Sequence, residues 1–118
     1  IVRDPFSVDD DGSITCFGDV PEGEFVTILQ GDQTSLVEAA HAAYSTARSS
    51  GSADALVFFD CISRVLYLEG DFDRELAAVT PEELPLFGAL TIGEIANDGS
   101  GHLDYYTKTA VVGALEDV

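Results

Sequence analysis

Arg64 is the cationic side chain whose setting in this sequence best suits the binding of an anion. It is one of only five basic residues in a chain of 118, against 22 acidic ones. It lies one turn into a helix that is predicted to follow the apolar run 55–59. A guanidinium at that place can hold a carboxylate or a phosphate through two parallel hydrogen bonds. An equally good interpretation is that Arg64 pairs with a neighbouring acid such as Asp60.

Cys61 and Glu94 are two further side chains that could support chemistry. Cys61 begins the same helix, where the helix N-terminus and Arg64 would both favour the thiolate; the alternative is a small buried core residue. Glu94 lies between isoleucines and follows Gly93, a residue that lets the backbone approach another group closely. A carboxylate among apolar neighbours needs a partner, either Arg64 or a bound ammonium group. Opposite charges on Arg64 and Glu94 would suit a zwitterion.

A predicted central strand and two predicted helices position these residues. The run Ala55–Phe59 is apolar without alternation, which is typical of a strand covered on both faces. The end of such a strand is where ligands tend to bind in open α/β sheets. An apolar stripe predicts a helix from about 33 to 49, and a second helical stretch runs from Cys61 to Val79 with a break at Gly70 and Asp71.

The other strands complete a mixed α and β fold. Residues 13–17 and 24–29 are predicted to pair as a β-hairpin across a turn-rich linker. Two more strands are predicted at 86–92 and 105–114, joined by the loop 97–101. The predicted order is β-β-α-β-α-β-β, an α+β fold in which helices pack on a mixed sheet.

The charge of the chain indicates its environment and excludes several partners. A net charge of −17 accompanies a hydrophobic fraction of 46%, which is far too high for a disordered acidic tail. Salt near 1 M shortens the screening length to about 3 Å and relieves the repulsion, so we predict halophilic adaptation with an acidic surface. Nucleic acids and anionic membranes need clustered Lys and Arg, so neither is an expected partner. We expect one domain over 1–118, excised from a larger cytoplasmic chain because Ile1 replaces an initiating Met and no signal peptide is evident.

Metal and cofactor motifs are absent or incomplete. Residues 9–14 (DDDGSI) resemble part of a calcium-binding loop, but Gly18 stands where a bidentate Glu is needed. The two cysteines and two histidines are isolated from one another, which argues against zinc. No glycine-rich phosphate loop joins a strand to a helix. We therefore predict neither a metal nor a cofactor, and we expect both cysteines to be reduced.

Three runs stand in a distinctive order: residues 55–64 (ALVFFDCISR), 85–95 (PLFGALTIGEI) and 107–112 (TKTAVV). With the turn at 21–23 before an apolar strand, they resemble the C-terminal FIST domain, a sensory module. The departures are Asp60 in place of Ser, Ile62-Ser63 where Gly often precedes the Arg, and Thr107 in place of Asn. The resemblance implies a ligand-sensing domain of bacterial and archaeal signal-transduction proteins, usually following a FIST N-terminal domain in the same chain and binding a small molecule such as an amino acid. Carried over by position, it implies the site residues Cys61, Arg64, Gly93, Glu94 and Thr109.

We therefore predict a domain without catalytic activity, in which Arg64 and the helix N-terminus bind a carboxylate and Glu94 binds an ammonium group. Two alternatives remain open. One is an enzyme with Cys61 as nucleophile and His102 as base. The other is a structural or homodimerising module, in which Arg64 pairs with Glu94 and the strand 105–114 pairs with another chain.

Overall fold

A three-stranded sheet forms the centre of the molecule. The computed structural model describes residues 1–49, 51–97 and 101–117. Strand β3 (Ala55–Cys61) lies between β4 (Leu86–Thr91), which is parallel to it, and β7 (Ala110–Leu115), which is antiparallel. The prediction that residues 55–59 form a central strand is confirmed. Both outer edges of this sheet, one on β4 and one on β7, lack a partner strand among the described residues.

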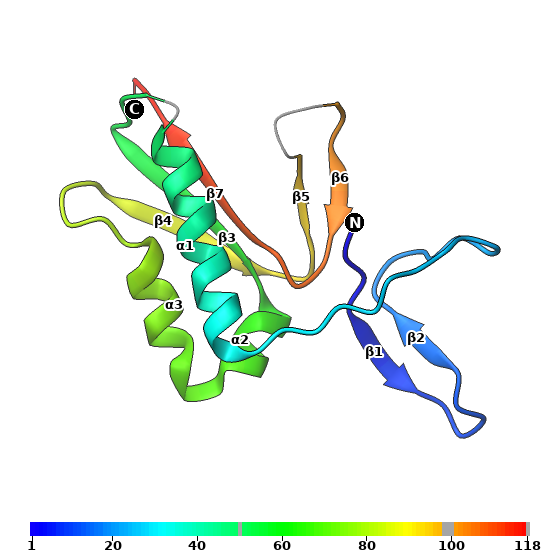
Figure 1. Ribbon diagram of the computed structural model, residues 1–118. Coiled ribbons are helices and arrows are strands. Elements are labelled where there is room, and N and C mark those ends of the chain that lie inside the picture. Colours follow the sequence, from blue (N-terminus) through cyan, green and yellow to red (C-terminus); the bar gives the residue numbers. More distant parts are fainter. Residues whose placement is uncertain (50, 98–100, 118) are drawn as a thin grey trace.

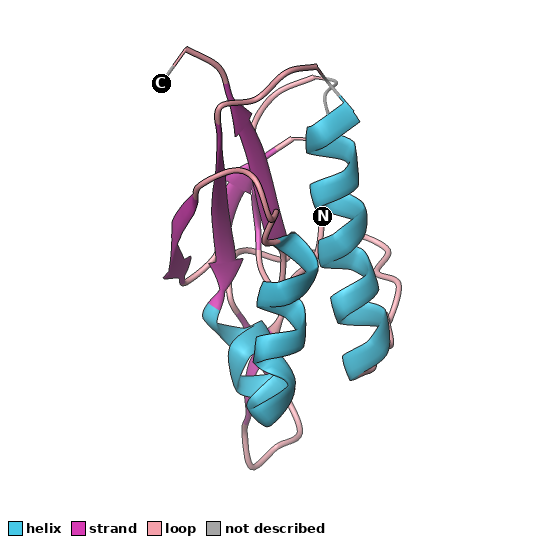
Figure 2. Ribbon diagram, turned by 90° about the vertical axis from the view of Figure 1, so that its left-hand side faces the viewer, coloured by secondary structure: helices cyan, strands magenta, loops and turns pink. Residues whose placement is uncertain are grey.

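The helices cover one face of the sheet. These are α1 (Gln33–Ser49), α2 (Ile62–Leu68), the 3-10 turn η1 (Glu69–Asp71) and α3 (Phe72–Val79). Figures 1 and 2 show α1 and α3 side by side on the same face, where Ala40 and Val79 pack on Phe58. The predicted helix boundaries and the break near Gly70 are confirmed. The expectation that β3 is covered on both faces is wrong, because Phe59 on the opposite face is exposed.

The N-terminal hairpin differs from the predicted one. Strand β1 (Pro5–Val8) pairs with β2 (Ile14–Cys16), whereas residues 24–29 lie outside any strand. The reason is the acidic turn between β1 and β2. Its backbone closes through a bond from the Asp9 N–H to the Ser13 carbonyl, and Asp11 Oδ1 accepts from the Ser13 N–H at 2.9 Å. The segment 13–17 therefore finds its partner before it in the chain rather than after it.

The C-terminal part contains three strands after β4 rather than the one that was predicted. Strand β5 (Glu94–Ala96) pairs with β6 (Asp104–Tyr106), and β7 follows separately. The predicted loop 97–101 lies between β5 and β6, and residues 98–100 of it are outside the described residues. The predicted single strand 105–114 is wrong because the backbone turns at Lys108, whose φ is +56°. Lys108 Nζ binds Asp4 Oδ1 at 3.2 Å, which ties this turn to the N-terminus.

The arrangement confirms an α+β fold. Helices lie on a mixed sheet, and two small hairpins stand beside it (Figure 1). Among the residues described, none of the helices has the length and apolar character needed to cross a membrane.

Candidate functional site

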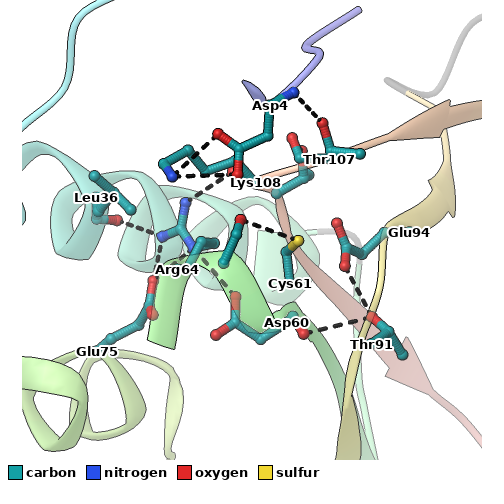
Figure 3. Close-up of polar contacts among 12 residues, drawn as sticks. Asp4, Leu36, Asp60, Cys61, Arg64, Glu75, Thr91, Glu94, Thr107 and Lys108 are labelled. Carbon is teal, nitrogen blue, oxygen red and sulfur yellow. Dashed lines mark hydrogen bonds and ion pairs between the residues drawn. The ribbon is translucent and has the colours of Figure 1, made fainter. Parts of the chain in front are cut away.

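Arg64 is buried and bound to acids of its own chain. It lies in the first turn of α2, and its side chain is only 5% exposed. Nε contacts Asp60 Oδ1 at 3.1 Å and donates to Glu75 Oε1 at 2.9 Å, while one terminal nitrogen contacts Glu75 and the Leu36 carbonyl (Figure 3). The other terminal nitrogen lies 3.4 Å from the Lys108 carbonyl oxygen. Pairing with Asp60 was one of the two interpretations of Arg64; Glu75 was not predicted as a partner.

Three buried carboxylates lie near this cation, and with Arg64 they are here called the buried polar cluster: Asp60 and Glu75, which contact it, and Glu94, which does not. Asp60 is the second-last residue of β3, Glu75 lies on α3, and Glu94 begins β5. Burial raises the pKa of Asp60 to about 7; the nearby Glu75 charge adds to the rise and Arg64 opposes it. Burial also raises the pKa of Glu94, while hydrogen bonds from the Thr91 hydroxyl and the Thr109 backbone lower it.

The cluster leaves carboxylate oxygens without hydrogen-bond partners. Both oxygens of Asp60, and one each of Glu75 and Glu94, are buried without such a bond, although Asp60 Oδ1 makes the ion pair with Arg64. Thr91 lies between Asp60 and Glu94. Its Oγ1 donates to Glu94 Oε1 at 2.8 Å and lies 3.4 Å from the Asp60 carbonyl oxygen. The cluster therefore has one arginine for three carboxylates. A proton bound to Asp60 reduces its net negative charge.

Three of the predicted site residues, Cys61, Glu94 and Thr109, come together at the start of β7. The Cys61 N–H donates to the Thr109 carbonyl oxygen at 3.1 Å, and hydrogen bonding from the Thr109 backbone and the Cys61 side chain lowers the pKa of Glu94. The thiol itself is buried, with Sγ 3.3 Å from Ser63 Oγ. Arg64 joins them only through Asp60, not by a direct bond to Glu94. The pairing of Arg64 with Glu94 that the structural-module alternative requires is therefore not formed.

Gly93 has a steric role beside this group. Its φ is +81°, a region that side chains disfavour, and a Cβ there would collide with the ring of Tyr105. The Tyr105 hydroxyl lies 3.3 Å from the Ile92 carbonyl oxygen, which holds the ring over the turn. Gly93 thus permits the close approach that the sequence predicted, with Tyr105 as the approaching group.

A groove of about 640 Å³ lies between α1, β7 and the β5–β6 hairpin. Its walls are mostly small and apolar, and its polar side chains are neutral. The lining consists of Ala43, Thr46, Ala47, Ala96, Asn97, Tyr106, Thr109, Ala110, Val111, Val112 and Ala114. Thr109 is the predicted site residue that lines it. A smaller groove of about 310 Å³, between α3 and β4, is lined by apolar residues and Gly88. Neither groove is bordered by Arg64 or Glu94.

The metal motifs considered in the sequence find no support in the described residues. No group of three His, Cys, Asp or Glu side chains there could hold a metal ion. In the acidic segment 9–14, Asp9 and Asp11 accept hydrogen bonds from Ser13 and so stabilise the turn.

Glu75 is the member of the cluster that sequence reasoning missed. It occupies the apolar face of α3, four residues before the buried Val79. An acid on the buried stripe of an amphipathic helix was the signal that could have identified it, because a buried carboxylate needs a cationic partner.

Comparison with known proteins identifies the family. The model of the FIST C domain matches residues 1–97, and the chain belongs to this family of sensory domains of signal transduction, which typically occurs with an N-terminal FIST domain. No curated protein matches the chain. No solved structure matches it either. The match covers Cys61, Arg64, Gly93 and Glu94, while Thr109 and the run 107–112 lie beyond it.

Proposed function

We propose that this chain is a non-catalytic ligand-sensing domain of a cytoplasmic signal-transduction protein, and that it binds a small molecule such as an amino acid in the groove between α1, β7 and the β5–β6 hairpin. The observation that carries the proposal is the groove itself. Its volume of about 640 Å³ is within the ~300–1,000 Å³ range typical of ligand sites, and it combines apolar walls with few polar groups.

The groove is placed where binding could be relayed to the buried polar cluster. Thr109 lines the groove with its neighbours on β7, and its backbone bonds to both Cys61 and Glu94. A ligand that displaces the start of β7 would lengthen or break these bonds. Because Glu94 is buried, losing a donor would change its charge state or its position. Sensing would then consist of a shift of β7 that the cluster transmits to α2 and α3.

The structure requires a change in the hypothesis that Arg64 binds the carboxylate of an amino acid and Glu94 its ammonium group. The donors of Arg64 already contact Asp60, Glu75 and two backbone carbonyls, so a ligand carboxylate would have to displace an internal partner. A neutral donor in the groove offers an alternative for the carboxylate, for example the hydroxyl of Tyr106, whereas the Thr109 hydroxyl already donates to the Thr107 carbonyl oxygen at 3.1 Å. Glu94 does not line the groove, but it keeps one buried oxygen without a partner, so it becomes the candidate for an ammonium group once β7 is displaced.

A pair of matched alanine substitutions tests the location of the site. Ala47→Leu extends a side chain into the groove, whereas Ala42→Leu places the same side chain on an exposed position of α1. Leucine is a good helix former, so neither change should weaken the helix appreciably. We expect amino acids that raise the melting temperature of the wild type in molar KCl to do so in Ala42→Leu but not in Ala47→Leu. An equal ligand response in both variants would place the ligand elsewhere.

The role of Glu94 is tested with the same panel. Glu94→Gln keeps the shape of the side chain and removes its charge. If Glu94 binds the ammonium group, the variant should lose its response to amino acids while uncharged analogues still bind. A response to amino acids equal to that of the wild type would rule out this role. Arg64→Ala is less informative because it leaves two buried carboxylates without their cation.

Two placements favour a binding domain over a cysteine enzyme. The Cys61 thiol is buried against Ser63, and the imidazole of His102 is 88% exposed and lies 3.5 Å from Asp104. A nucleophile and its base must come within hydrogen-bond reach, and here each has another neighbour. Slow labelling of Cys61 by a thiol reagent at neutral pH would agree with the binding function. Rapid stoichiometric labelling would favour the enzyme.

A further inference from the structure

Residues 24–29 (EFVTIL), here called the strap, are a strand-forming segment without a strand partner. Phe25 and Ile28 are almost fully exposed, at 104% and 94%, and Val26 and Leu29 are exposed as well. The β-branched and aromatic content of this segment suits a pleated, half-buried strand. Such a run of exposed apolar side chains marks an interaction surface. We therefore looked for a surface of the domain on which the strap could pair as a strand and bury these side chains.

The outer edge of β7 has the matching properties. It is unpaired among the described residues, and β7 is six residues long, as is the strap. An unpaired edge offers a row of free backbone donors and acceptors to another strand. The groove runs along this edge, and the side chains that α1 presents to it are small, among them Ala43 and Ala47. Small walls leave room for the larger side chains of the strap.

The chain connection favours β7 over the other free edge, on β4. The strap lies just before α1, and α1 leads to β3. The crossover from β3 through α3 to β4 moves toward the β4 edge, with α3 on the same face of the sheet as α1 (Figures 1 and 2). Crossovers between parallel strands share one hand, so a strap–α1–β3 crossover must move in the same direction. It must therefore begin on the opposite side of β3, beside β7.

Charge also favours this docking. The strap carries one charge, at Glu24, and no charged side chain lines the groove. In a chain with a net charge of −17, contact between these two surfaces adds little repulsion. Docking would also continue the contact that α1 already makes with β7, where Tyr44 packs in the same cluster as Ala110 and Val112.

We propose that the strap docks as an additional strand on the outer edge of β7, antiparallel to it, and closes the groove. The arrangement in the structure is then the open state of the domain. A closed strap would cover the proposed ligand groove and compete with the ligand or enclose it. That regulatory consequence rests on the proposed function, whereas the docking itself does not.

Hydrogen exchange of the ligand-free chain tests the docking. We expect backbone amides of the strap to exchange at least about tenfold more slowly than those of an unpaired segment, because a paired strand must open first. Phe25→Glu combined with Ile28→Glu should abolish this protection and also speed exchange in β7. The control is Leu66→Glu, which changes an exposed apolar residue on α2. Unprotected strap amides in the wild type would overturn the proposal.

Dilution and proline variants separate the remaining outcomes. Protection that disappears on dilution would mean that the strap pairs with a second copy of the chain, which overturns intramolecular docking. Alternate amides of a strand face its partner, so Val26→Pro and Thr27→Pro should differ in their effect on β7 protection. Equal exchange in both variants and the wild type would also overturn the proposal. These measurements contain no ligand, so a failure to find a ligand leaves their result unchanged.

Discussion

Replacing Asp60 by Asn should remove a large part of the pH dependence of stability. Asp60 is fully buried beside Arg64 and Glu75, and burial raises the pKa of its carboxyl to about 7. In the unfolded chain the same carboxyl loses its proton near pH 4, at about 3.9. Between these values the folded protein binds more protons than the unfolded one. Its free energy of unfolding therefore falls as the pH rises.

The size of this effect follows from the width of the interval. The stabilisation is fully present below about pH 4 and is lost as the pH rises through about 7. That interval covers about three decades of proton concentration, each worth about 1.4 kcal/mol, so the loss is on the order of 4 kcal/mol. Asparagine resembles the protonated acid in shape and cannot ionise. Asp60→Asn should therefore lose much less stability over the same interval.

Urea unfolding between about pH 4 and pH 8 in molar KCl measures the difference in pH dependence between the variant and the wild type. The urea concentration at the midpoint is proportional to the unfolding free energy when the dependence of that free energy on urea concentration is unchanged. Asp10→Asn removes an exposed carboxyl and serves as the control, which should follow the wild type. Burial raises the pKa of Glu94 as well, so some decline should persist in Asp60→Asn. A decline as steep as that of the wild type would refute the assignment of the proton to Asp60.

Three further predictions concern stability. Gly93→Ala should destabilise the domain by about 2 kcal/mol, seen as a lower melting temperature, because the methyl group meets the Tyr105 ring at a positive φ; no change would mean that the turn is not tight. Arg64→Lys should cost about 3 kcal/mol in urea unfolding, since an ammonium cannot bind Asp60 and Glu75 with the same geometry; wild-type stability would contradict the buried ion pairs. Raising KCl from about 0.1 M to about 1 M should raise the melting temperature by screening the repulsion of a −17 chain, and a decrease would contradict halophilic adaptation.

The elements with strong local signals were predictable from the sequence. The apolar stripe of α1, the unbroken apolar run of β3 and the break at Gly70 each appear where their patterns indicate. The partner of a strand was less predictable, because pairing depends on which segments meet in space. Residues 13–17 were expected to pair with 24–29 but pair with β1, since the acidic turn brings that strand close.

The site was predictable in its residue types but not in its contacts. Cys61, Glu94 and Thr109 do meet, because β3, β5 and β7 converge there. Arg64 was expected either to face a ligand or to pair with an acid such as Asp60. It pairs with Asp60 and also with Glu75, which comes from a helix that the strand patterns could not place. A single buried acid changes the apolar pattern of an amphipathic helix very little, so it is hard to detect in the sequence. Its ion pair nevertheless determines where a neighbouring arginine is held.

The scarcity of basic residues explains why protons are needed in the buried polar cluster. Arg64 is the basic side chain that contacts two of these carboxylates, Asp60 and Glu75, in the described part of the chain, and the nearby Lys108 is paired with Asp4. With no second cation, the charge of three buried acids is reduced by keeping a proton on Asp60. The Thr109 N–H stabilises the ionised form of Glu94 and lies on the residue that lines the groove. If a ligand in the groove moves β7, as we propose, occupancy of the groove and protonation of the cluster would be thermodynamically linked, and each would change the other by the same free energy.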